Sequence, residues 1–223
     1  MRRLLPIALL ALVALGTATL ASLPCSAQQV GFACDRQTCW AMDPPAGNAN
    51  APFSEGAIDL TGDGVPETIL REDETLHVLQ GGVEIWHSDP TWHVADAALG
   101  DPNDDGRYEI LAALWKPDDA GVLASHPFII GHRGGAVKVL WGGSAVAQSI
   151  HEVALADVDG DGVEELIVLE SAQPGDGPDA TQRTLSVWDW HGWGFNLRWR
   201  SAAGRYANLG LTEDGIIVAT VEK

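Results

Sequence analysis

The chain has 223 residues, enough for one domain with a substantial core, and 46% of them are hydrophobic, which argues against a disordered chain. Its 31 Asp and Glu residues outnumber 13 Lys and Arg residues, giving a formal net charge of −18. We therefore expect no nucleic-acid partner, because phosphate binding needs a basic face. Such an acidic excess favours cation binding wherever the carboxylates cluster.

The N-terminal segment has the pattern of an export signal. Two arginines precede an apolar run over residues 4–15, which is too short for a membrane span, and small residues lead up to Ala27. We expect residues 1–27 to be a signal peptide and the protein to be secreted or held at the cell surface. The alternative is a lipid anchor on Cys25, and we expect membrane association only in that case.

The next segment, residues 28–56, contains the two remaining cysteines and then a linker. Cys34 and Cys39 are an even pair in a chain bound for an oxidising compartment, so we expect them to form a disulfide. The stretch that follows, residues 40–56, is rich in Pro, Gly and Asn, which is typical of a loop. Repeats occupy the rest of the chain, residues 57–223.

One acidic loop occurs three times. Its copies begin at residues 59, 101 and 157, a spacing of 42 and then 56 residues, which indicates a repeat architecture. Their sequences are DLTGDGVPE (59–67), DPNDDGRYE (101–109) and DVDGDGVEE (157–165). A run of strand-forming residues follows each loop, and farther on comes a glycine turn with a strand that contains Trp86, Trp141 or Trp199.

This unit predicts the fold class. Each unit contains four strands, which is the content of a propeller blade. Their order is strand, acidic turn, strand, connecting loop, strand, glycine turn and tryptophan strand. Residues 205–221 provide half of another blade. We therefore predict an all-β, β-propeller-like array of about three and a half to four four-stranded blades. Residues 30–42 either complete the fourth blade, or the array stays open and its edges pair with a second subunit, giving a homo-oligomer.

The acidic loops have the composition of calcium sites. Side-chain oxygens stand at positions 1, 3, 5 and 9, and glycine at position 6 permits the sharp reversal that brings them together. The carbonyl of position 7 adds a further ligand. The predicted ligands are Asp59, Thr61, Asp63, Val65 and Glu67; Asp101, Asn103, Asp105, Arg107 and Glu109; and Asp157, Asp159, Asp161, Val163 and Glu165.

An EF-hand is excluded by one position. That motif needs Glu at position 12, where this chain has Leu70, Ala112 and Val168. Magnesium fits less well than calcium, because it keeps several waters rather than accept an all-protein cage.

The three loops with their strand flanks resemble the FG-GAP/VCBS repeat family, found in integrin α-chain propellers and many bacterial surface proteins. The resemblance covers residues 57–221 and implies that calcium binds between the first two strands of a blade and stabilises it. Thr61 departs from the family pattern, since an acid or Asn is usual there, so we expect the first site to be the weakest. The blade count is also below the family's usual ring.

We find no catalytic constellation in the sequence. The seven histidines lack the H-E-x-x-H spacing of a zinc enzyme, and we interpret the clustered Trp188, Trp190 and Trp193 as packing residues or an aromatic platform. We therefore predict an exported, non-catalytic calcium-binding module that binds an extracellular protein or glycan. The alternative is an extracellular polysaccharide-acting enzyme, which would need two free carboxylates converging in a central pocket.

Overall fold

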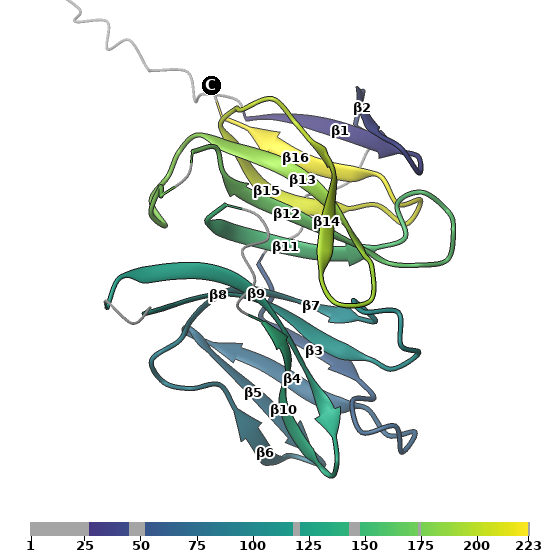
Figure 1. Ribbon diagram of the computed structural model, residues 1–223, viewed down its shortest axis with the longest axis vertical. Coiled ribbons are helices and arrows are strands. Elements are labelled where there is room, and N and C mark those ends of the chain that lie inside the picture. Colours follow the sequence, from purple (N-terminus) through teal and green to yellow (C-terminus); the bar gives the residue numbers. More distant parts are fainter. Residues whose placement is uncertain (1–26, 45–51, 118–120, 143–147, 174, 223) are drawn as a thin grey trace, which may run out of the picture.

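The computed structural model describes residues 27–44, 52–117, 121–142, 148–173 and 175–222. This part of the chain contains 16 strands in four antiparallel four-stranded sheets and no helix, so the all-β prediction is confirmed (Figure 1). Nothing in it is a helix long and apolar enough to cross a membrane. The predicted signal peptide lies outside the described residues except for Ala27.

Three sheets are consecutive meanders, and each follows the predicted order of strand, acidic loop, strand, strand, glycine turn, strand. The first sheet contains β3 (Glu55–Ile58), β4 (Glu67–Glu72), β5 (Thr75–Gln80) and β6 (Val83–His87). The second contains β7 (His93–Gly100), β8 (Glu109–Pro117), β9 (Leu123–Arg133) and β10 (Ala136–Gly142). The third contains β11 (Ile150–Ala156), β12 (Glu165–Ser171), β13 (Arg183–Trp190) and β14 (Phe195–Arg200).

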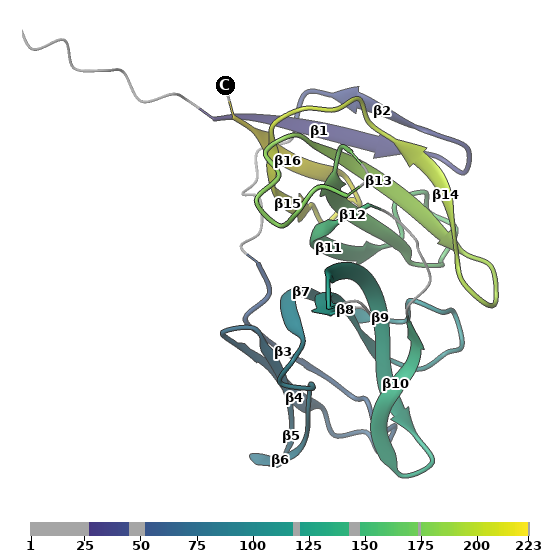
Figure 2. The ribbon, with the colours of Figure 1, turned by 60° about the vertical axis from the view of Figure 1, so that its left-hand side comes forward.

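The fourth sheet is built from both ends of the chain. Its strand order is β15 (Tyr206–Leu211), β16 (Ile217–Val221), β1 (Gln28–Cys34) and β2 (Cys39–Met42). β1 lies antiparallel beside β16, as both views show (Figures 1 and 2). Completion of a fourth sheet by the N-terminal segment, one of the two alternatives that the sequence left open, is confirmed. So is the Cys34–Cys39 disulfide, which joins β1 to β2 and is consistent with an oxidising compartment.

Three hydrophobic clusters hold neighbouring sheets together. The alternation of strand side chains sends Ile110 of β8 into the cluster with the first sheet and Leu111 into the cluster with the third. Likewise Leu166 of β12 packs toward the second sheet and Ile167 toward the fourth. The four sheets therefore stack in a row, with the first and fourth at opposite ends of the molecule (Figure 1).

The last strand of each of the first three sheets carries a β-bulge at the same place. The register against the preceding strand shifts by one residue, which leaves Ile85, Leu140 and Arg198 as the extra residues. Directly after each bulge stands a repeated tryptophan: Trp86, Trp141 or Trp199. All three pack against the clusters between sheets.

Candidate metal centre

The three acidic loops share one hydrogen-bond skeleton. The Asp at position 1 accepts backbone N–H groups from the far side of its own loop: Asp59 Oδ2 from Gly64 (2.9 Å), Asp101 Oδ2 from Gly106 (2.8 Å) and Asp157 Oδ2 from Gly162 (2.8 Å). The Gly at position 6 has φ of 87°, 78° and 92° in the three loops, a conformation that L-residues rarely adopt. This accounts for the repeated Asp-Gly pair.

The Asp at position 5 fixes the second half of each loop. Its Oδ1 accepts the N–H of position 7, which is Val65 (2.8 Å), Arg107 (3.1 Å) or Val163 (2.9 Å). Position 7 was predicted to supply a carbonyl ligand, and its N–H group thus has a structural role as well.

The Glu at position 9 is the first residue of β4, β8 or β12 and points into the protein. Glu67 and Glu109 are 0% exposed and Glu165 is 2% exposed. Gly131 on β9 leaves room for Glu109, because a Cβ at that position would lie 2.6 Å from Glu109 Cγ. A buried carboxylate needs a partner, so the surroundings of these three side chains decide what each loop can bind.

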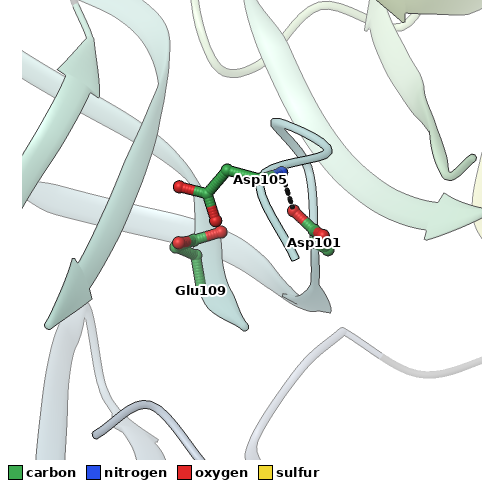
Figure 3. A group of neighbouring side chains, drawn as sticks. All are labelled: Asp101, Asp105 and Glu109. Atoms are coloured by element: carbon green, nitrogen blue, oxygen red, sulfur yellow. Dashed lines mark hydrogen bonds between the residues drawn. The ribbon is translucent and has the colours of Figure 1, made fainter. Parts of the chain in front are cut away.

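Two of the loops bring three carboxylates together. In the second loop, oxygens of Asp101, Asp105 and Glu109 lie within 4.8 Å of one another (Figure 3). The third loop does the same with Asp157, Asp159 and Glu165. Both groups can hold a metal ion.

The first loop differs from the other two. Glu67 Oε2 accepts the N–H groups of Leu60 (2.9 Å) and Thr61 (3.2 Å), and Glu67 Oε1 accepts the Thr61 hydroxyl (3.2 Å). Asp63 Oδ2 accepts the side-chain amide of Gln80 (3.3 Å). The loop thus satisfies its own buried carboxylate, and its acids form no converging group of three among the described residues.

Glu109 lacks the donor that its counterparts have. In the other two loops the residue at position 2 donates its N–H to the buried Glu. Leu60 donates to Glu67 in the first loop (2.9 Å), and Val158 donates to Glu165 in the third (3.0 Å). The second loop has Pro102 there, which has no N–H. Glu109 Oε2 accordingly finds no hydrogen-bond partner within the described part of the chain. Burial raises the pKa of Glu109 to about 7.

Two arginines complete the sites, and the sequence pattern did not identify either. Arg133, at the end of β9, places Nη2 2.5 Å from Asp105 Oδ2 and 2.6 Å from Glu109 Oε1. Arg198, the bulged residue of β14, contacts Asp159 (2.7 Å), Glu165 (3.1 Å) and Asp189 (2.6 Å). Despite that pairing, burial raises the pKa of Glu165 to about 7. The repeated Trp199 follows this bulge directly, but strand alternation alone does not predict that an extra residue precedes it.

The remaining predicted ligands lie beside these groups. Asn103 Oδ1 accepts the N–H of Asp105 (3.1 Å). Asp161 is not part of the converging group, and its Oδ2 lies 3.9 Å from Nη2 of Arg36, between β1 and β2.

The acidic loops lie next to one another along one edge of the stack. The first and second loops line a cavity of about 320 Å³, and the second and third loops line another of about 310 Å³. The N–H of Asp101 also donates to Glu164 of the third loop (2.7 Å). A cation bound at one loop therefore lies close to the carboxylates of the next.

A separate cavity of about 250 Å³ lies among β7, β11 and β15 and contains two acids. Asp96 accepts the N–H groups of Phe53 (2.7 Å) and Val153 (3.0 Å), one on each oxygen. Glu152 accepts those of Asn208 (3.1 Å) and Leu209 (2.6 Å) in the same way. Burial raises the pKa of both carboxyl groups. Their oxygens are engaged in joining neighbouring sheets.

No protein-family model matches the chain, and a search of curated proteins found no match.

Proposed function

We propose that this protein is an exported calcium-binding module built from FG-GAP/VCBS-type repeats in a β-propeller-like arrangement, and that it binds an extracellular protein or glycan without catalysis. The observation that carries the proposal is the loop skeleton, repeated three times with the same donors and acceptors. In two copies it gathers three carboxylates at one point. Calcium locks these two loops between the first two strands of their sheets.

The donor set fits calcium. Calcium takes six to eight oxygen ligands, and the second loop offers carboxylates from Asp101, Asp105 and Glu109 with the amide oxygen of Asn103 beside them. Glu109 Oε2 is a buried acceptor for which the described residues provide no donor, and a cation supplies what it lacks. Arg133 now neutralises part of this charge, so binding of the ion requires that Arg133 give up its contacts with Asp105 and Glu109.

The surface offers an aromatic contact for the proposed partner. Trp188 is 8% exposed and Trp190 packs against Trp141 and Phe195, whereas Trp193 is 77% exposed between β13 and β14. An exposed tryptophan supports binding of a sugar ring or a protein side chain.

The non-catalytic proposal draws support from Asp96 and Glu152. A polysaccharide-acting enzyme needs two carboxylates that can exchange protons with substrate. The two acids that line the cavity among β7, β11 and β15 each accept backbone N–H groups on both oxygens. Proton transfer there would break contacts between sheets.

The test is thermal unfolding of residues 28–223 with calcium and with a chelator. We expect calcium to raise the unfolding temperature, because a ligand at about 100 times its Kd stabilises the folded state by about 2.7 kcal/mol. Asp105→Asn should remove a large part of this shift. The matched substitution Asp63→Asn, at the same position of the first loop, should remove little. An unfolding temperature that does not respond to calcium would refute the proposal.

The partner class needs its own measurement. Calcium-loaded protein should bind a member of a glycan array or an extracellular protein panel, and Trp193→Ala should weaken that binding while leaving the calcium shift unchanged. Turnover of a polysaccharide by the same preparation would instead support the enzymatic alternative.

A further inference from the structure

Two histidines and a glutamate meet on the outer face of the first sheet, away from the acidic loops. His77 on β5 lies directly opposite His87 on β6. Between them is Glu84, whose Oε2 lies 2.6 Å from His77 Nδ1 and whose Oε1 lies 3.0 Å from His87 Nδ1. The two ring centroids are 6.3 Å apart. One carboxylate thus joins two imidazoles from neighbouring strands.

The β-bulge at Ile85 creates this arrangement. Side chains alternate along a regular strand, so Glu84 and His87, three residues apart, would point to opposite faces. The extra residue changes the parity, and Glu84 pairs with Leu79, which is on the same face as His77. All three side chains therefore share one face of the sheet. Bulges are known to re-aim side chains in this way next to functional sites.

The same bulge in the other two sheets does not assemble such a group. The equivalent positions hold Phe128, Val139 and Gly142 in the second sheet and Ser186, Leu197 and Arg200 in the third. The shared scaffold therefore accounts for the placement but not for the choice of two imidazoles and a carboxylate in the first sheet.

We propose that His77, Glu84 and His87 bind a divalent transition-metal ion of the zinc and copper class. Imidazole nitrogen and carboxylate oxygen are ligands that such ions prefer, whereas calcium prefers oxygen alone. At a tetrahedral angle, two imidazoles that share one ion have ring centroids roughly 5 Å apart when each metal–nitrogen bond is about 2.0–2.1 Å. The observed separation of 6.3 Å is wider, so the two rings must turn toward the ion as it binds.

The three side chains have the freedom and the charge that the site needs. They are 24%, 46% and 57% exposed for His77, Glu84 and His87, so the rings can turn toward a shared ion and water can fill its open positions. Hydrogen bonds from the two imidazoles hold the pKa of Glu84 below its ordinary value, so this carboxylate is an anion at neutral pH. The site stands apart from the proposed calcium loops and does not depend on them.

The test is calorimetric titration of residues 28–223 with Zn²⁺ in excess calcium, which occupies the acidic loops. We expect one equivalent of zinc to bind, and His77→Gln and His87→Gln each to weaken binding at least tenfold. His93→Gln is the matched control, because His93 pairs with a single carboxylate, Glu74 (2.5 Å), near the same sheet. It should leave zinc binding unchanged.

Two results would overturn the proposal. One is the absence of zinc binding by the calcium-loaded protein. The other is zinc binding that survives both the His77 and the His87 substitutions, since the ion would then lie elsewhere. Unchanged unfolding temperatures of the variants in metal-free buffer establish that each is folded, so loss of zinc binding reports on the site itself.

Discussion

The first and second acidic loops have the same backbone and different interiors. In both, Asp at position 1 gathers the N–H groups of the loop and Asp at position 5 fixes position 7. In the first loop, hydroxyl and N–H donors surround Glu67. In the second, Glu109 is left with Arg133 on one oxygen and no described donor on the other.

This difference shows that the loop fold and the cation site are separable. The skeleton needs only Asp at positions 1 and 5 and Gly at position 6, and it forms whether or not three carboxylates converge. Position 2 does not decide convergence, because Val158 donates its N–H to Glu165 in the third loop, which still gathers three carboxylates. The difference lies at position 3, where the first loop has Thr61, whose hydroxyl donates to Glu67. An acidic loop of this pattern can therefore be a turn or a site, depending on what its position 3 offers to the buried Glu.

The largest effect on stability should come from removing the Asp carboxylate at position 1 of a loop. Asp59→Ala and Asp101→Ala each delete a charged acceptor of loop N–H groups, and we expect each to lower the free energy of unfolding by roughly 1–3 kcal/mol in chelator. With calcium present, the Asp101 variant should also lose the stabilisation that the ion provides. The difference in unfolding free energy between the two variants should therefore increase. Denaturant unfolding with and without calcium measures both quantities. Equal calcium responses in the two variants would contradict the distinction between the loops.

A smaller effect concerns pH. The folded-state pKa of Glu109 is about 7 against an ordinary value of 4.5, so the folded protein keeps a proton that the unfolded chain releases. Stability in chelator should therefore fall as pH rises from about 4.5 to 7 and level off above that. Glu109→Gln removes this contribution and should flatten the profile in that window. The free energy of unfolding of this variant still depends on pH in that window, because the pKa of Glu165 is also raised to about 7.

Chemical denaturation in chelator at several pH values checks this expectation. Glu67→Gln is the comparison from the first loop, and it should lower stability across the range, because the carboxylate that it replaces accepts three hydrogen bonds. A profile for Glu109→Gln as steep as that of the parent protein would show that Glu109 does not retain the proton.

The smallest effect should follow Pro102→Ala. The new N–H gives Glu109 Oε2 the donor that Leu60 supplies to Glu67, a gain of about 1 kcal/mol. Without the proline the unfolded chain gains conformational entropy, which lowers the free energy of unfolding by roughly 0.4–1 kcal/mol and offsets this gain. The net change in unfolding free energy is then small. The pH profile in chelator should nevertheless become shallower, because the hydrogen bond favours the charged carboxylate.

Much of the architecture could be predicted from sequence because it is local and repeated. The acidic loops, the strands after them, the repeated tryptophans and the small disulfide all depend on residues near one another in the chain. Completion of the fourth sheet by residues 30–42 was one of two alternatives, since a half blade at the C-terminus needs partners either from this chain or from a second subunit.

The surroundings of the sites could not be predicted in the same way. Arg133 and Arg198 reach the loops from strands 24 and 33 residues beyond Glu109 and Glu165, and Arg198 does so through a bulge. The group of His77, Glu84 and His87 depends on another bulge, which changes which face each side chain occupies. Sequence periodicity assumes a regular strand and assigns Glu84 to the wrong face.

The fourth sheet sets an order of events for the newly made chain. Gln28 of β1 pairs with Val221 of β16, a partner 193 residues later. At roughly 5–20 residues per second, the ribosome needs on the order of 10–40 s to make that partner. The first strand thus exists long before it can pair with β16, although β2 is available to it at once. The cystine between β1 and β2 ties this hairpin together without any contact to β16, and a hairpin held in that way is less open to mispairing while the last strands arrive.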